Sequence, residues 1–267
     1  MLKKTIHITI TLLLFASVSC SEYNKLVKST DLDKKYEMAI KYYEKKDFVK
    51  ALPLFEELVT VYRATTKAEN IQYYYAYTNY NMGDYTLARF QFQNFISTFP
   101  NSVHIEEFAY LNAYCYYLDS PTYSLDQTDT KAAIKELQAF INQYPKSSRL
   151  TECNNIVEKL REKLERKAYE IAKQYYSIGD YKASIYSFQN TLKEFPDTKY
   201  SEELSFLIVK SNYLLAINSI ETKKEERLTA TINTYLKFID KYPKSSYLKD
   251  AESMYTSALK IKQRIKI

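Results

Sequence analysis

The chain has 267 residues, and 46% of them are hydrophobic, which is enough for a substantial core in one or two domains. Two glycines and six prolines are few for this length, which argues against a sheet protein with tight hairpin turns and for a mostly helical one. The formal charge of +6 is spread along the chain without a dense basic run, which argues against nucleic-acid binding.

The first 20 residues have the pattern of a secretory signal. Lys3 and Lys4 precede an apolar stretch over residues 6–18, which is too short for a stable membrane span in the mature protein. The small residues before Cys20 resemble a bacterial lipobox, which implies removal of residues 1–19 and a Cys20 that carries diacylglycerol and an acylated amine. Ser21 favours the outer membrane, because aspartate is usual at this position in lipoproteins retained at the inner membrane. The alternative is an ordinary signal peptide cut near Ser19. Residues 20–30 are expected to be a lipidated N-terminus and a short polar tether.

The rest of the chain contains a repeated helical unit. Gly83-Asp84-Tyr85 and Gly179-Asp180-Tyr181 are each followed at the same distances by a phenylalanine and then by a Phe-Pro pair. Aromatic-Pro pairs occur four times, and a hydroxyl residue follows each proline by two positions: Ser102, Ser147, Thr198 and Ser245. Glycine in the turn, proline at the end of the second helix and a hydroxyl cap for the next helix predict repeated helix pairs.

The predicted fold is all-α: a tetratricopeptide-like α-solenoid of about five helix pairs with a C-terminal capping helix. The four prolines of these pairs lie 45, 51 and 47 residues apart, whereas a standard unit has about 34 residues. The extra length is assigned to a loop over residues 118–129 and to one unbroken helix over residues 147–178; a last helix is expected over 247–262. Residues 31–145 hold units one to three, and residues 146–267 hold units four and five with the capping helix.

This order of loop, long helix and long repeats behind a lipobox resembles the BamD (YfiO/ComL) family of outer-membrane lipoproteins. The most specific stretches are Asp126-Gln127-Thr128-Asp129-Thr130, Tyr144-Pro145-Lys146-Ser147 and Glu165-Arg166-Lys167-Ala168-Tyr169. The resemblance implies a lipid-anchored scaffold on the periplasmic face of the outer membrane, within the machinery that assembles β-barrel proteins. The alternative is a tetratricopeptide adaptor of another envelope process, such as cell-wall or division coordination.

Repeat arrays of this kind bind extended peptides along the wall that their first helices form. In the predicted register, the wall-facing positions of units one and two are Tyr36, Ile40, Tyr43, Asn70, Tyr73, Tyr77 and Tyr80. The resemblance implies that the ligands are the aromatic-ended C-terminal segments of unfolded barrel proteins. The alternative, that these tyrosines only fill the packing between repeats, stays open.

For the C-terminal half, the resemblance implies docking to a periplasmic domain of a BamA-like, barrel-forming assembly subunit. Candidate contacts are charges on units four and five and the basic end, Lys260, Lys262, Arg264 and Lys266. The alternative is that this cationic last turn only complements the helix dipole.

No pattern in the sequence points to catalysis, to a cofactor or to a metal. His104 is the histidine left after signal removal, and no base and nucleophile stand out as a pair. Cys115 and Cys153 lie in helical patterns without metal-type spacing, and two buried free thiols are expected. The chain is therefore predicted to be a binding protein and not an enzyme.

Overall fold

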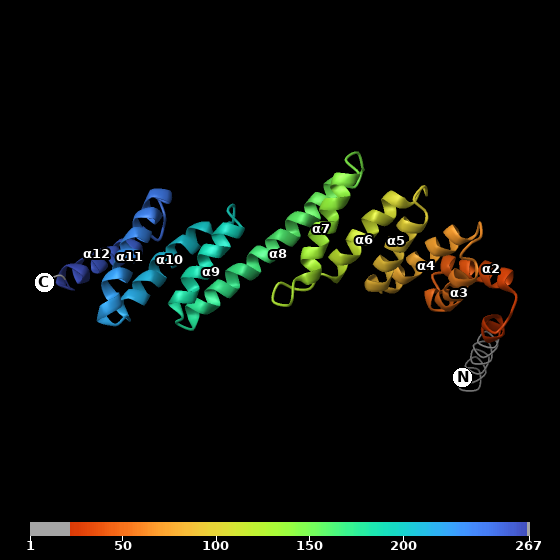
Figure 1. Cartoon of the computed structure of the whole chain (residues 1–267), viewed down its shortest axis with the longest axis horizontal. Coiled ribbons are helices and arrows are strands. Elements are labelled where there is room, and N and C mark those ends of the chain that lie inside the picture. Colours follow the sequence, from red (N-terminus) through yellow and green to blue (C-terminus); the bar gives the residue numbers. More distant parts are fainter. Residues whose placement is uncertain (1–21, 266–267) are drawn as a thin grey trace, which may run out of the picture. The chain divides into compact units, whose positions relative to one another are not determined.

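The computed structural model describes residues 22–265, which are helical and contain no strand (Figure 1). A short helical segment at residues 22–27 precedes the longer helices. These are α2 (Leu32–Glu44), α3 (Phe48–Val61), α4 (Ala68–Met82), α5 (Tyr85–Thr98), α6 (Ile105–Asp119), α7 (Thr128–Gln143), α8 (Leu150–Ser177), α9 (Tyr181–Glu194), α10 (Ser201–Ile217), α11 (Glu221–Lys241) and α12 (Leu248–Ile265). The predicted fold of five helix pairs and a last helix is confirmed for the described residues.

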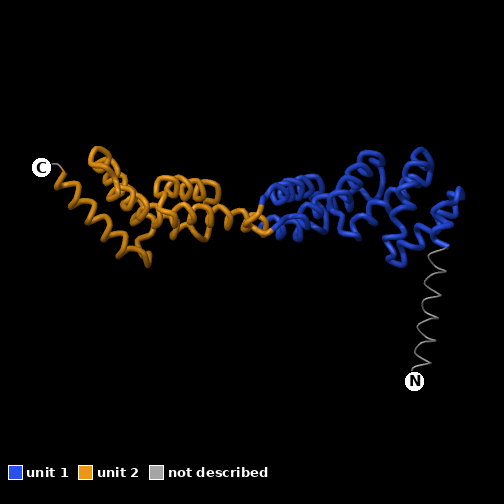
Figure 2. Tube along the Cα trace, turned by 90° about the horizontal axis from the view of Figure 1, so that it is seen from below, with its two compact units in different colours: residues 1–121, 126–158 blue, residues 122–125, 159–267 orange. Residues whose placement is uncertain are grey.

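The chain divides into two compact units (Figure 2). Within the described residues, unit 1 comprises residues 22–121 and 126–158, and unit 2 comprises residues 122–125 and 159–265. This division falls inside α8 and not at residue 146, because α8 is one continuous helix that contributes its first turns to unit 1 and the remainder to unit 2.

The long helix and the loop before it lie where the sequence predicts them. Helix α8 has 28 residues, which corresponds to about 42 Å at 1.5 Å per residue. It begins three residues later than predicted, because residues 147–149 form the turn that follows Pro145. The loop between α6 and α7 covers residues 120–127, slightly less than the predicted 118–129.

Glycine ends the first helix of two pairs in the left-handed conformation. Gly83 and Gly179 both have φ of +81°, and the following Asp84 and Asp180 cap α5 and α9 through their carboxylates. In the first pair the same position is occupied by Lys46, a non-glycine residue with φ of +59°. The backbone turn is therefore common to three pairs, although glycine forms it in only two.

The hydroxyl residue after each proline orders the turn before the next helix. In all four copies its oxygen accepts a hydrogen bond from the amide two residues later, at 3.1–3.2 Å. That amide belongs to the residue immediately before the helix. The predicted helix cap is thus corrected to a hydroxyl-stabilised turn, because the bond does not reach an amide inside the helix.

Each unit has its own aromatic core. In unit 1 it includes Phe55 and Ile71, and in unit 2 it includes Phe188 and Phe238, all of which are nearly or fully inaccessible to solvent. Fully burying one such side chain contributes about 1.5–3 kcal/mol. Small residues on the first helices, such as the fully buried Ala39 and Ala172, allow the paired helices to approach closely.

The segment expected to be a polar tether is partly structured. Residues 22–27 are helical, Leu26 is 7% exposed, and the Tyr23 hydroxyl donates to the Lys50 carbonyl at 3.1 Å. The Tyr23 ring also packs edge-on against Tyr42 at 5.7 Å. The expectation of a tether is wrong for these residues, because two apolar side chains dock them on α2 and α3. Cys20 lies outside the described residues.

Candidate peptide-binding wall

The first helices of unit 1 place tyrosines at three repeating positions. The reference point is a fully buried alanine in each helix, Ala39, Ala76 and Ala113, and these alanines are 37 residues apart. An aromatic residue stands three positions before each alanine, a large side chain one position after it, and a tyrosine four positions after it. We call this surface the wall; its members are Tyr36, Ile40, Tyr43, Tyr73, Tyr77, Tyr80, Tyr110, Tyr114 and Tyr117.

The predicted wall residues of α2 and α4 differ in exposure. The rings of Tyr73 and Tyr77 lie 4.8 Å apart and are half-buried, as are the other predicted aromatic positions and Ile40. Asn70 is exposed, and its amide donates to the Tyr36 hydroxyl at 2.6 Å. The structure thus brings the predicted residues onto two neighbouring helices and leaves part of each ring accessible.

Helix α6 continues the wall with the half-buried Tyr114 and Tyr117 and with Tyr110, which is only 3% exposed; none of the three was predicted from the sequence. The Tyr110 and Tyr114 rings stack at 5.4 Å, and Tyr117 lies 5.4 Å from Tyr114. The signal that could have found them is the 37-residue spacing of the buried alanines, which the larger and unequal proline spacing hides.

One carboxylate lies among the wall tyrosines. Burial and a hydrogen bond with Glu107 raise the pKa of Tyr77 far above its usual value of 10.0. Burial, together with the Glu107 charge, also raises the pKa of Tyr73. These phenols therefore stay protonated at physiological pH and hold Glu107 in place as hydrogen-bond donors or close neighbours.

Tyr43 and Tyr80, each four positions after its alanine, also resist ionisation. Burial is the main cause that raises the pKa of Tyr43 to about 12 and that of Tyr80 to about 12. Tyr43 packs against Tyr74 at 4.9 Å, and Tyr80 packs against Tyr85 at 5.8 Å. These two phenols are therefore uncharged at neutral pH, and the wall combines aromatic rings with the Glu107 carboxylate.

Some predicted wall residues also hold the repeats together. Each first helix has one fully buried reference residue: Ala39, Ala76, Ala113, Ala172 or Val209. At each joint between repeats, the aromatic residue three positions before it contacts the residue that immediately precedes the next first helix. Two of these contacts join a cation to a ring centroid: Lys67 Nζ lies 5.0 Å from the Tyr36 ring, and Arg149 Cζ lies 4.1 Å from the Tyr110 ring. In the other three, ring centroids lie 4.5 Å apart for Tyr73–His104, 4.0 Å for Tyr169–Tyr200 and 4.6 Å for Phe206–Tyr247. Tyr36 and Tyr73 therefore contribute to packing between repeats, as the alternative interpretation of these tyrosines states.

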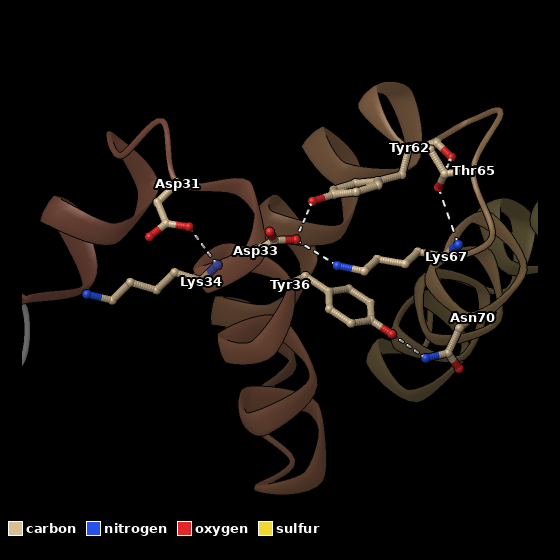
Figure 3. A network of polar contacts seen from close by, with 8 residues as sticks. All are labelled: Asp31, Asp33, Lys34, Tyr36, Tyr62, Thr65, Lys67 and Asn70. Carbon is tan, nitrogen blue, oxygen red and sulfur yellow. Dashed lines mark hydrogen bonds and ion pairs between the residues drawn. The ribbon is translucent and has the colours of Figure 1, made fainter.

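Figure 3 shows the first of these joints. Tyr36 reaches from α2 to Asn70 on α4, while Asp33 accepts hydrogen bonds from Lys67 at 2.6 Å and from the Tyr62 hydroxyl at 2.9 Å. These bonds lower the pKa of the Asp33 carboxyl, with the Lys67 bond as the largest cause. All these groups are exposed or half-exposed, so the network orients α4 on α2 more than it stabilises the fold.

Unit 2 has different chemistry at one wall position. The residue after the buried small residue is Lys173 in α8 and Lys210 in α10, where unit 1 has isoleucine or tyrosine. Lys173 donates to the Tyr169 hydroxyl at 2.9 Å and pairs with Glu203 at 3.4 Å, and the Lys210 ammonium lies 5.7 Å from the centroid of the Tyr176 ring. The corresponding surface of unit 2 therefore carries lysines beside its aromatic rings.

Cys115, Cys153 and Lys262, three of the remaining candidate residues, have structural roles. Cys115 and Cys153 are buried free thiols, as predicted. Lys262 donates to Thr229 at 2.8 Å and so ties α12 to α11; Lys266 lies outside the described residues. Within residues 22–265 no group of acidic, histidine or cysteine side chains is arranged to hold a metal. None of the helices described there combines the length and apolar content that a membrane span needs.

Comparison with known proteins matches the chain to one family. A model of the YfiO family, described as "Outer membrane lipoprotein", covers residues 29–228. Two similar proteins are named "Outer membrane protein assembly factor BamD", one from Caulobacter vibrioides and one from Buchnera aphidicola subsp. Acyrthosiphon pisum. The first is 24% identical over 142 residues, 53% of this chain and 47% of its own length, so the match spans about half of that relative. The second is 24% identical over 226 residues, 80% of this chain and 92% of its own length.

Solved structures that resemble the chain are tetratricopeptide domains. The TPR domain of P58(IPK) aligns with a TM-score of 0.41 and 13% identity over 91% of this chain and 67% of that chain. The TPR2AB domain of yeast Sti1 aligns with a TM-score of 0.39 and 12% identity over 85% of this chain and 98% of that chain.

Proposed function

Because the chain belongs to the YfiO family of outer membrane lipoproteins, we propose that it is a lipid-anchored scaffold of the machinery that assembles β-barrel proteins in the outer membrane. The observation that carries the proposal is the family match over residues 29–228, which extends from the first helix pair into the fifth. Its role is to bind and position other proteins and not to catalyse a reaction.

We place the anchor at Cys20 and the protein on the periplasmic face of the outer membrane. The lipobox-like residues before Cys20 support this placement. Replacing Cys20 with serine should release the protein into the soluble periplasmic fraction. Continued fractionation of that variant with the membrane would rule out the acyl chains as its attachment.

The wall of unit 1 is the proposed site for extended segments of unfolded barrel proteins. The partly accessible rings of Tyr43 and Tyr80, whose phenols have raised pKa values, match the apolar and aromatic side chains of such segments. Unit 2, with lysines in the corresponding positions, is the proposed docking site for the barrel-forming subunit. A pull-down from detergent-solubilised membranes tests this second contact, and absence of that subunit from the complex would overturn the scaffold role.

The wall can be tested with substitutions that the fold already tolerates. In unit 2 a lysine follows the buried reference residue of each first helix, at the position that Ile40 and Tyr114 occupy in unit 1. The double variant Ile40→Lys with Tyr114→Lys should therefore preserve helicity while making the wall cationic. The expected result is a loss of at least about tenfold in affinity for a peptide with an aromatic C-terminus, the scale of a binding hot spot. The matched control is Val49→Lys with Phe90→Lys, two residues of second helices that are 72% and 60% exposed. Equal affinities of the two double variants would show that the peptide binds elsewhere.

A further inference from the structure

Helix α2 carries lysines along one of its faces. Lys34, Lys41 and Lys45 are spaced by seven and four residues, so they lie above one another, with Lys45 directly after the last helical residue. All three are exposed. The ion pairs found in this region involve other lysines, namely Lys35 with Glu57, Lys50 with Asp47 and Lys67 with Asp33.

This face borders a hollow beside the N-terminal segment. The hollow has a volume of about 410 Å³ and includes Lys25 from the N-terminal segment and Lys34 from α2. Leu26, Met38 and Tyr42 supply its apolar part, and Glu22 is the carboxylate that lines it. We call Lys25, Lys34, Lys41 and Lys45 together the lysine face.

The lysine face lies close to the proposed anchor along the chain. Only one residue separates Cys20 from Glu22, and an extended chain of this length spans at most about 7 Å. The segment that follows is held against α2 and α3 by the buried Leu26 and by the Tyr23–Lys50 hydrogen bond. Three further helical residues, about 4.5 Å, lead to Lys25, so the lysine face begins at most about 12 Å along the chain from the position where the acyl chains begin, between one and two Debye lengths of about 8 Å at physiological salt.

We propose that the lysine face rests on the anionic phospholipid headgroups of the leaflet that holds the acyl chains. The proposal rests on the lipid anchoring at Cys20 proposed above. Unpaired, exposed lysines are attracted to a negative surface, and each one near such a surface contributes a factor of about five in partitioning. The acyl chains keep the protein at the membrane, and the lysine face decides which side of unit 1 is turned toward it.

The orientation has a consequence for the wall. Tyr36, Ile40 and Tyr43 lie on the face of α2 nearly opposite the lysines, and in Figure 3 the side chains of Lys34 and Tyr36 leave the helix in opposite directions. With the lysine face on the headgroups, the wall of unit 1 opens away from the membrane. Segments arriving through the periplasm could then reach it without crossing the lipid surface.

The experiment uses the full mature chain with Cys20→Ser, so that no acyl chain contributes. Its binding is measured by sedimentation with vesicles of phosphatidylcholine alone and of phosphatidylcholine mixed with phosphatidylglycerol. We expect binding to the mixed vesicles only, weakened by added salt. The triple variant Lys34→Gln, Lys41→Gln, Lys45→Gln should lower the partition coefficient by at least about tenfold. The control triple Lys182→Gln, Lys237→Gln, Lys244→Gln removes the same charge from exposed lysines of unit 2 and should change it by less than about twofold.

Two results would overturn the proposal. One is a similar loss in both triple variants, which would show attraction by overall charge and not by this face. The other is equal binding to neutral and mixed vesicles, or binding to neither. Because neither a peptide nor a partner is present, these outcomes are independent of the peptide and pull-down tests, and membrane fractionation of the acylated chain separately tests the anchor.

Discussion

Three helix pairs share a left-handed turn, and substitutions at its equivalent positions should change the unfolding free energy in opposite directions. Lys46 has φ of +59°, and Gly83 and Gly179 have φ of +81°. We expect Lys46→Gly to stabilise the protein, and alanine at either glycine to destabilise it. The neighbouring Lys45, with φ of −79°, provides a control one residue away.

The magnitude follows from two opposing contributions. A side chain in the left-handed region costs about 1–2 kcal/mol, and glycine loses about 0.5–1 kcal/mol more conformational entropy on folding than alanine does. The net effect of Lys46→Gly is thus a gain of about 0.5–1 kcal/mol in unfolding free energy. A Cβ added at either glycine would meet no atom within 4 Å, so Gly83→Ala and Gly179→Ala should lose a similar amount through the backbone alone. Lys45→Gly carries only the entropic contribution and should lose about 0.5–1 kcal/mol.

The assay must resolve parts of the array, because helical repeats can unfold separately. Urea unfolding followed by circular dichroism gives the total, and native-state hydrogen exchange of amides in α2 and α3 reports the first pair. The Lys46 amide bonds to the Tyr43 carbonyl at 2.8 Å, and this bond should be retained in the glycine variant. Equal destabilisation by Lys45→Gly and Lys46→Gly would refute the reasoning, since it would mean that the turn stores no strain at Lys46.

Three further predictions concern the joints, the caps and the wall. Tyr169→Ala removes a ring that is 7% exposed and stacked 4.0 Å from the Tyr200 ring. It should lower the unfolding free energy by about 3–4 kcal/mol, measured as a lower urea midpoint for unit 2. A loss below about 1 kcal/mol would contradict the role of this joint. Asp84→Ala removes the carboxylate that accepts a hydrogen bond from the Leu87 amide at 2.9 Å. It should lower the unfolding free energy by about 1 kcal/mol in the same assay, whereas Asp84→Asn, which keeps a capping oxygen, should lose much less. Because the folded pKa values of Tyr43 and Tyr80 are raised to about 12, their contribution to stability is present below pH 10 and is lost as pH rises toward 12. Phenolate absorbance and circular dichroism should therefore change together in this window, and ionisation of all tyrosines near pH 10 without unfolding would contradict it.

The candidate wall was only partly accessible to prediction. The sequence placed Tyr73 and Tyr77 on one helix face, because helical periodicity depends on local spacing alone. It could not separate a ring that binds a ligand from a ring that joins repeats. That difference depends on His104, whose ring packs against Tyr73 from the next repeat, and on Glu107, which bonds to Tyr77. Similarly, no local pattern indicated that Tyr23 and Leu26 dock the N-terminal segment, because their contacts are with residues more than ten positions away.

The sequence by itself determined the helix pairs and their limits, since glycine, proline and hydroxyl residues act through backbone dihedral angles and hydrogen bonds within a few residues. It also indicated the lipoprotein signal and the long α8. The tertiary structure decided which tyrosines are joints, how α6 extends the wall, and that a lysine adopts the conformation of a glycine at position 46. It also brought Lys25 of the N-terminal segment to the same hollow as Lys34 of α2. These features depend on the three-dimensional arrangement of the chain, which side-chain spacing along one helix does not encode.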